Sequence, residues 1–416
     1  MTSTKTIPDH NEFILSARER REKSEWCAQL ITLAKEPNDE IHFDDRNQVL
    51  RCLYPSEIHA LETRCRCSCR NWALIRVLLN LDSFREDQSF LLGSLLSDNA
   101  FDGVVVFVLI RDEFSAPNGS DIATIDFMKL PPGLHSNLMI SDSVFHLTSC
   151  RVYRNSLISN TFVASHAVAI NCGIISVTES QTLGEIAMSV GPESGGGRNL
   201  VLAVEDTMID VCNLLRAGGS GRQLSNCPLM LNVLSNYSVI RVTPTIKNVF
   251  LFPNASIQAA ASVTSAVLLP ESTIGNSCVV SNVLLQWNAA ISDNSSISET
   301  LLMEQAHAGP HSFVASSVLG PDVHVSAGEI HASIIGMRIE NRRSSLNDDS
   351  TFPNLESSIF VLFRTEYERA PSESPNWRTL AYGSGERWIW SQCRVQPHRK
   401  TAGSRDKCRR GNILGS

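Results

Sequence analysis

Three histidines in the last third of the chain have the residue type best suited to acid–base chemistry. His307 and His324 are 17 residues apart, and His311 follows His307 by four residues across a Gly-Pro pair. A neutral imidazole accepts a proton near pH 7 and can also bind zinc. We take these three histidines as candidate catalytic residues, with one of them as a general base. The alternative is an exposed or hydrogen-bonded ladder of histidines, and we predict no metal site.

A glycine-rich segment is the second candidate. Consecutive glycines allow backbone N–H groups to converge on an anion, and a neighbouring arginine can add a bidentate contact to phosphate or carboxylate. The segment lacks the lysine and hydroxyl of a P-loop, so the alternative is a flexible exit from the fold. We predict anion binding here and one site shared with His307. The anion-binding residues would be Gly195, Gly196, Gly197 and Arg198.

Three alternating cysteines are the third cluster. On an extended segment Cys65, Cys67 and Cys69 would point to one side, and the arginines between them would lower the thiol pKa values. Structural zinc sites prefer C-x₂-C pairs with a second ligand pair, which does not follow here. We therefore expect no cofactor.

The elements that position these residues are indicated by an internal repeat of 17 residues. Each repeat contains three six-residue steps, one of them shortened by a residue. This pattern predicts a solenoid whose turns have three short faces, each with one small apolar residue pointing inward. The three columns are Leu251, Leu268, Leu285, Leu302 and Leu319; Ile257, Ile274, Ile291, Ala308 and Val325; and Val263, Val280, Ile297, Val314 and His331, or Ile330 in place of His331.

Weaker six-residue spacing occurs earlier, so we predict two blocks of coils, at 134–178 and 246–338. Between them, 179–245 is an excursion with the glycine-rich loop and a helix from Asp206 to Ala217. Residues 1–45 are expected to be mobile or helical, 46–133 to form a small α/β region, and 339–416 to be a mostly disordered tail. The early columns would be Leu138, Val144 and Cys150, then Leu157, Val163, Ala169 and Ile175.

Composition limits the class of protein. The chain has 416 residues, 43% of them hydrophobic but only 6% aromatic, which suits a narrow solenoid interior. The net charge of −7 gives no general attraction to nucleic acid or to an anionic membrane. The start is polar, and the longest apolar run is too short to span a bilayer. We expect a cytoplasmic protein with no membrane and no specific nucleic-acid partner.

The six-residue step, with stretches such as STIGNSCV and AISDNSSI, resembles the hexapeptide-repeat superfamily. This resemblance implies a left-handed parallel β-helix, often trimeric. The elements LYPSEIHALE, LPPGLHSNLMISDS, RVYRNSLISNTFV, GPESGGGR and LGPDVHVSAGEIHASIIG further resemble a nucleotidyltransferase-like group with no established reaction, over roughly residues 50 to 336. From Met337 the chain departs from that group, which indicates a truncated or altered C-terminus.

Two functions follow as hypotheses. The first is a transferase-like protein that binds an anionic small molecule such as a sugar nucleotide or an acyl-CoA, with a histidine as base. The second is a non-catalytic scaffold for a homotrimer or another protein partner. Nucleotidyl transfer is not expected, because pyrophosphorylases resembling this chain have a separate α/β catalytic domain whose signature is not readable here.

Overall fold

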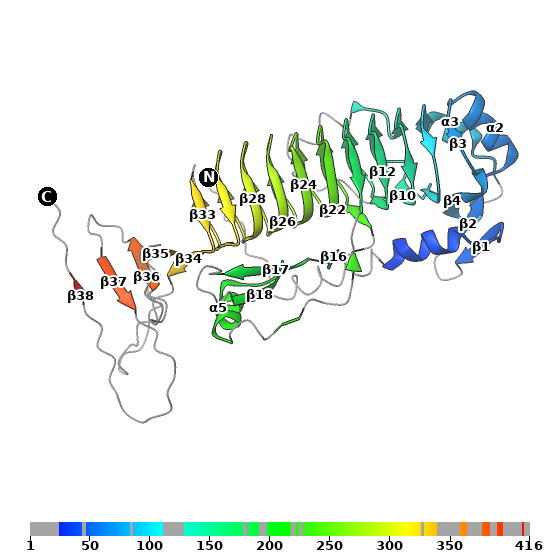
Figure 1. Ribbon diagram of the computed structural model, residues 1–416. Helices are drawn as coiled ribbons and strands as arrows, with labels where there is room; N and C mark the ends of the chain where they lie inside the picture. Colours follow the sequence, from blue (N-terminus) through cyan, green and yellow to red (C-terminus); the bar gives the residue numbers. More distant parts are fainter. Residues whose placement is uncertain are drawn as a thin grey trace, which may run out of the picture.

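The protein is a parallel β-solenoid of about 10 turns, with few helices (Figure 1). The computed structural model describes residues 25–43, 47–83, 86–110, 129–177, 181–182, 184–190, 198–217, 222–223, 228–229, 231–325 and 328–338, with strands at 358–363, 377–382, 389–393 and 410–411. The predicted all-β solenoid with an N-terminal α/β segment is confirmed.

Each coil has three faces, which we name by what lies outside them. The open face is formed by β3 (Ser68–Cys69), β6 (Ala100–Phe101), β9 (Ile140–Ser141), β12 (Leu157–Ser159), β15 (Ile174–Ser176), the first halves of β22 (Thr245–Leu251), β24 (Ser262–Leu268), β26 (Val279–Leu285) and β28 (Ser296–Leu302), then β30 (Phe313–Ala315) and β33 (Glu329–His331).

The covered face follows along each coil. It is formed by β4 (Ile75–Asn80), β7 (Val105–Val108), β10 (Ser143–His146), β13 (Thr161–Val163), β20 (Asn232–Leu234), the second halves of β22, β24, β26 and β28, then β31 (Val318–Leu319) and β34 (Ile334–Arg338). In the four long strands, residues with positive φ bend the chain around the corner between two faces; they are Asn248, Ser265, Asn282 and Glu299.

The histidine face is a separate sheet of ten parallel strands. It is formed by β5 (Leu96–Ser97), β8 (Gly133–His135), β11 (Arg151–Tyr153), β14 (Val168–Ile170), β21 (Val239–Arg241), β23 (Ser256–Gln258), β25 (Thr273–Ile274), β27 (Ala290–Ile291), β29 (His307–Ala308) and β32 (His324–Val325).

The inward columns of the second block are confirmed by burial. The five leucines from Leu251 to Leu319 have no exposed surface. At the end of the third column Ile330, rather than His331, pairs with Val314, so His331 lies outside the core. The same columns continue toward the N-terminus, where Phe107 and Phe145 occupy the leucine position. One apolar core therefore runs the length of the solenoid.

The early columns of the first block need correction. Leu138 is 72% exposed, and Leu157 is only partly buried. The inward positions are taken by Ile140 and Ile158, which pair with each other on adjacent coils. Val144 is buried in the outward apolar cluster of the covered face, and Phe145 takes the inward position. Corners in this block differ in length, so a strict six-residue count shifts by a residue or two.

The two predicted blocks are continuous in space. β13 pairs directly with β20, and β14 with β21, so the excursion leaves the stack and returns to the next coil. Parallel pairing also begins earlier than the six-residue spacing indicates, because β4 already pairs with β7. The connections in these first turns are longer, which hides them from a search for fixed periods.

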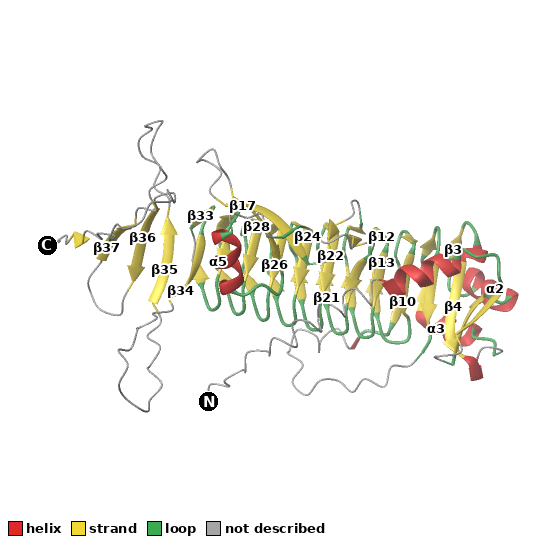
Figure 2. Ribbon diagram, turned by 90° about the horizontal axis from the view of Figure 1, so that it is seen from below, coloured by secondary structure: helices red, strands yellow, loops and turns green. Residues whose placement is uncertain are grey.

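The excursion lies along the covered face. It contains β16 (Gln181–Thr182) and β19 (Pro228–Leu229), the antiparallel hairpin of β17 (Glu185–Val190) and β18 (Arg198–Ala203), and α5 (Met208–Arg216). The helix begins two residues after the predicted Asp206, because Thr207 caps it and exchanges hydrogen bonds with Asp210. Figure 1 shows the hairpin beside the coils of β26 and β28, and Figure 2 shows α5 from below, lying against the stack.

The apolar contacts explain why the excursion lies there. The covered face has a second apolar column, one residue before the leucines, which points outward. The hairpin side chains of Ile186, Met188, Leu200 and Leu202 pack on this column in one buried cluster. Gln286 completes the contact, since its Nε2 donates to the carbonyl oxygens of Val204 at 2.8 Å and Asp206 at 2.9 Å. The outward column comprises Val233, Phe250, Val267, Leu284, Leu301, Val318 and Ile334.

A helix at residues 25–34 covers the first coils of the same face. Its Trp26 meets Phe162 edge to face, with ring centroids 5.9 Å apart. The buried Arg76 of β4 donates to the carbonyl oxygens of Ala34 and Glu36, near the C-terminal end of this helix. Cationic donors stabilise the carbonyls that a helix end leaves without partners. The covered face is thus occupied at both ends by the chain's own segments.

The N-terminal end of the stack is closed by β1 (Glu40–Phe43), β2 (Gln48–Cys52), α2 (Pro55–Thr63), α3 (Ser89–Leu95) and two 3₁₀ turns at Trp72–Leu74 and Leu81–Ser83. β2 pairs antiparallel with β4 and so continues the covered face. The segment LYPSEIHALE contains most of α2. Its N-cap is Tyr54, and Glu57 Oε2 accepts from the Tyr54 backbone N–H at 2.7 Å.

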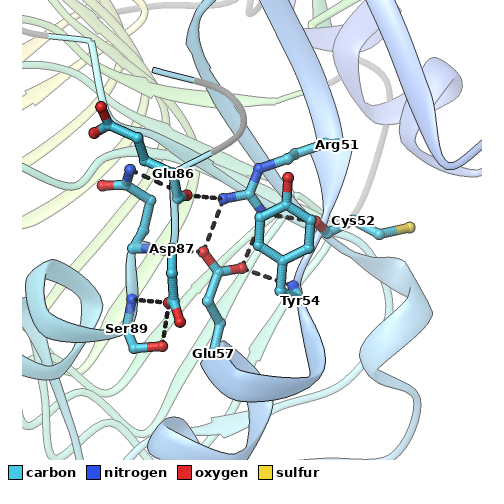
Figure 3. A network of polar contacts seen from close by, with 8 residues as sticks. Arg51, Cys52, Tyr54, Glu57, Glu86, Asp87 and Ser89 are labelled. Carbon is cyan, nitrogen blue, oxygen red and sulfur yellow. Dashed lines mark hydrogen bonds and ion pairs between the residues drawn. The ribbon is translucent and has the colours of Figure 1, made fainter.

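A buried ion pair holds this end cap together (Figure 3). Arg51 donates to both carboxylate oxygens of Glu57 at 2.8 Å, and both side chains are almost fully buried. Glu57 also accepts from the backbone of Gln88, and the Arg51 guanidinium lies 4.0 Å from the Tyr54 ring centroid. The carboxylate therefore joins β2, α2 and the start of α3, which is a structural role.

Of the predicted tail, the structure describes β35 (Ser358–Phe363), β36 (Trp377–Tyr382), β37 (Ile389–Cys393) and β38 (Arg410–Gly411), which continue antiparallel from β34. The rest of 339–416 lies outside the described residues.

Candidate functional site

The structure brings together two of the three predicted catalytic histidines. β29 and β32 pair in parallel with His307 opposite His324, and their rings meet edge to face with centroids 5.6 Å apart. Their neighbours Ala308 and Val325 belong to the inward column, so the imidazoles point outward. The 17-residue spacing therefore places both rings on adjacent coils of the histidine face.

His307 is the better placed of the pair for proton transfer. It is partly buried, and its Nε2 lies 2.5 Å from Oγ of Ser292, on the preceding coil. Burial, with a smaller contribution from the charge of His324, lowers the pKa of His307 below its usual 6.5. At pH 7 the ring is therefore neutral, which is the form that a general base requires.

His324 is more exposed and has an acidic neighbour. Its Nε2 lies 3.3 Å from Oδ1 of Asp322. This contact orients the second ring and places a carboxylate behind it. Ser292, His307, His324 and Asp322 thus form a polar row across three coils. Sequence reasoning missed Ser292 and Asp322, although Ser292 follows an inward isoleucine and is therefore expected to point outward.

The third candidate, His311, is not part of this row. It follows the Gly-Pro pair at the corner after β29, where it is exposed with a φ of 60°. Its backbone N–H donates to the carbonyl of Asp293. His331 is on the open face, where it contacts Glu329 and the ring of Phe313. Of these four histidines, His307 and His324 are neighbours on the histidine face. His311 lies at a corner, and His331 lies on the open face.

The predicted anion loop is only partly described. Gly195, Gly196 and Gly197 lie outside the described residues, and Arg198 is the first residue of β18. The hairpin of β17 and β18 packs against the covered face, whereas His307 points out from the histidine face. Within one chain, the described residues place the start of β18 and His307 over different faces.

The cysteine cluster has no activated thiol. Cys65 and Cys67 are buried, and burial raises the pKa of Cys65 and raises that of Cys67 to about 11. The expectation that neighbouring arginines lower these pKa values is wrong, because desolvation outweighs them. Over the described part of the chain, no group of three or more His, Cys, Asp or Glu side chains could hold a metal ion.

Comparison with known proteins agrees with the fold. Residues 229–303 match a family model described as GlmU-like, C-terminal hexapeptide. The match spans the return from the excursion and the long strands β22, β24, β26 and β28, where the 17-residue repeat is most regular. The chain is a hexapeptide-repeat β-helix protein.

Membership of this superfamily describes the architecture. A search of curated proteins found no match to the chain. Among the described residues, no helix is long and apolar enough to cross a membrane. The family match covers the coils that lead to the histidine pair but ends before His307.

Proposed function

We propose that this hexapeptide-repeat protein is transferase-like and that His307 is its general base, acting on a small anionic substrate such as an acyl-CoA or a sugar nucleotide. The observation that carries the proposal is the contact between His307 and Ser292 beside a second imidazole. A partly buried ring with a lowered pKa is neutral near pH 7, and its Nε2 contacts the Ser292 hydroxyl of the preceding coil. Rigid placement of a base favours proton transfer.

The histidine face supplies the rest of the arrangement. His324 places a second imidazole beside His307, and the Asp322 carboxylate lies 3.3 Å from its Nε2. In acyl transfer, the lone pair of the amine or hydroxyl acceptor would attack the carbonyl carbon of the thioester. His307 would remove the acceptor's proton as this bond forms. The thiol then leaves with a proton from the imidazolium. The ring returns to its neutral form, so no metal is needed to balance the reaction.

Anion binding by Gly195 to Arg198 remains part of the proposal as a separate element. Because β18 starts over the covered face, the loop is not assigned to the reaction centre of the same chain. Arg198→Ala should weaken the binding of an anionic ligand by about 1.5–3 kcal/mol, the range for a hydrogen bond to a charged group.

The proposal is tested by a thermal-shift screen with acyl-CoAs and sugar nucleotides, followed by turnover of any compound that binds. His307→Asn keeps a side chain that can bond to Ser292 but removes the base, so it should preserve binding and abolish most turnover. His59→Asn is a matched control, because His59 is exposed on α2 in the end cap. Unchanged turnover in His307→Asn would refute the role of His307.

The scaffold hypothesis is the second candidate, and one observation favours it. Large apolar side chains remain exposed on the open face, although the covered face is occupied by the chain's own segments. If the screen finds no ligand, assembly becomes the better account of the fold. Hexapeptide-repeat proteins often form trimers, so a homotrimer is the assembly that the superfamily suggests.

A further inference from the structure

The open face has the composition of an interface. Over the eight coils from β9 to β30, its outward side chains form two columns flanking the inward one. Among these 16 positions only Lys247 is charged, whereas charged residues make up 19% of the chain. Depletion of charge distinguishes interface cores from ordinary surface. The first column is Met139, Leu157, Ile174, Thr245, Ser262, Val279, Ser296 and Phe313; the second is Ser141, Ser159, Ser176, Lys247, Thr264, Ser281, Ser298 and Ala315.

Large apolar side chains lie toward both ends of the first column. Met139, Ile174, Val279 and Phe313 keep between 39% and 48% of their surface exposed. The middle of the column is Thr245 and Ser262, and the second column is almost entirely small. A flat sheet with small side chains beside an apolar row allows another flat sheet to approach closely.

A two-fold axis pairs the exposed apolar side chains of the first column with one another. Consider a two-fold axis that runs parallel to the strands in the plane of the open face, between the coils of Thr245 and Ser262. Rotation about this axis reverses the order of the coils, so each column of one copy faces the same column of the other copy in reverse order. It places Ile174 against Val279 and Met139 against Phe313 of the other copy, while Thr245 meets Ser262 and the partly buried Leu157 meets Ser296. Lys247 meets Thr264, so no like charges face each other. Isologous contacts of this kind close on themselves.

The size of the face also suits a dimer. Eight coils spaced by about 4.8 Å span about 34 Å, and five residues across at about 3.3 Å each give a width of about 17 Å. Such a strip buries about 600 Å² on each copy, or about 1,200 Å² in total, which is the lower end of the range for specific interfaces.

We propose that the open face binds a second copy of this chain, face to face and antiparallel, with Ile174 of each copy packed against Val279 of the other. The occupant is a second copy because the reversal brings the four exposed apolar side chains of the first column together in two pairs and places no like charges opposite each other. A trimer of parallel helices would not pair these positions.

The test is sedimentation equilibrium of the full chain, which should give twice the chain mass of 45.8 kDa. Ile174→Glu places two carboxylates against apolar surface in the dimer and should raise the dissociation constant at least about tenfold. Ile209→Glu is the matched control, because Ile209 is 61% exposed on α5, away from the open face. It should leave the mass unchanged.

A charge pair tests the antiparallel register. Ile174→Glu combined with Val279→Lys brings opposite charges together twice in the proposed dimer, so it should recover at least part of the lost affinity, whereas Ile174→Glu with Val279→Glu should not. Far-UV circular dichroism and thermal melting confirm that each variant is folded. A monomeric or trimeric wild type, an unaffected Ile174→Glu variant, or a failure of the lysine to restore assembly would overturn the proposal.

Discussion

The register of the solenoid is tested by a charge placed on either side of one strand. Val280 of β26 lies in the apolar core and is 1% exposed, and the next residue, Ser281, points outward on the open face. Val280→Asp buries a carboxylate among apolar side chains, whereas Ser281→Asp places it in solvent. The two substitutions introduce the same side chain at neighbouring positions of one strand. They differ in whether this side chain points into the core or outward.

The cost of Val280→Asp follows from desolvation. Burial without a partner raises the pKa of a carboxyl group by about 3–5 units, to about 7–9 for Asp, so at pH 7 the group must fold in its protonated form. This costs about 4 kcal/mol, from about 1.4 kcal/mol for each pH unit between the unfolded pKa of about 3.9 and pH 7. Loss of the buried valine adds about 2 kcal/mol. The sum of about 6 kcal/mol is comparable with the whole stability of a typical domain. Ser281→Asp should change the free energy of unfolding by less than about 0.5 kcal/mol.

Urea unfolding of dilute protein measures both values without a contribution from assembly. Because the pKa of Asp in place of Val280 is raised in the folded state, the penalty is largest above that raised pKa. The penalty falls as the pH is lowered from this raised pKa toward the unfolded pKa of about 3.9. Below both pKa values the carboxyl group is neutral in both states, so only the loss of apolar burial and of a polar hydrogen bond remains. Equal destabilisation by the two substitutions, or a penalty for Val280→Asp that grows on acidification, would refute the assigned register.

Three other predictions concern the contacts that hold the site and its supports. Gln286→Leu leaves two carbonyls of the excursion without donors, so it should weaken docking by about 1–3 kcal/mol and speed proteolysis between β15 and β20. Glu57→Gln leaves Arg51 buried without a counter-charge and should cost about 3–5 kcal/mol, measured by chemical denaturation. In NMR titration His307 should have a pKa below 6.5, and His324→Ala should raise it, since the charge of His324 contributes to the lowering.

The regular part of the fold could be predicted because each coil repeats the same physical constraint. A narrow interior accepts one apolar side chain per face, so the leucine column appears as a fixed period. The period fails where corners change length, which is why Leu138 and Leu157 were wrongly placed inward. At the C-terminal end one shortened step brings Ile330 into the column in place of His331, and this alternative was open from the sequence.

The covered face was not foreseen, although the sequence contains its signal. Phe250 and Leu251, Leu284 and Leu285, and then Leu301 and Leu302 are adjacent apolar pairs. In a strand, adjacent residues point to opposite sides, so such pairs indicate burial on both faces. What buries the outer side could not be deduced, because the excursion shows no period.

The candidate site could be predicted only in part. The 17-residue spacing correctly brings His307 and His324 together, since equal positions on adjacent coils are neighbours. It cannot show that Ser292 contacts His307, because that contact is a diagonal between strands and depends on side-chain rotamers. Nor could the sequence show that Arg198 begins a hairpin on another face, since this depends on how the excursion docks.

The central functional claim is that His307 is a general base on the histidine face. The most direct measurement is the pH dependence of thiol release from an acyl-CoA identified by the binding screen, with an amine or hydroxyl acceptor, for the wild type and His307→Asn. The account predicts that kcat falls as pH is lowered below 6.5 toward the lowered pKa of His307. It also predicts that His307→Asn lowers kcat about 10²–10⁴-fold and removes this acidic limb while binding is preserved. A variant with the wild-type rate and the same pH profile would contradict it.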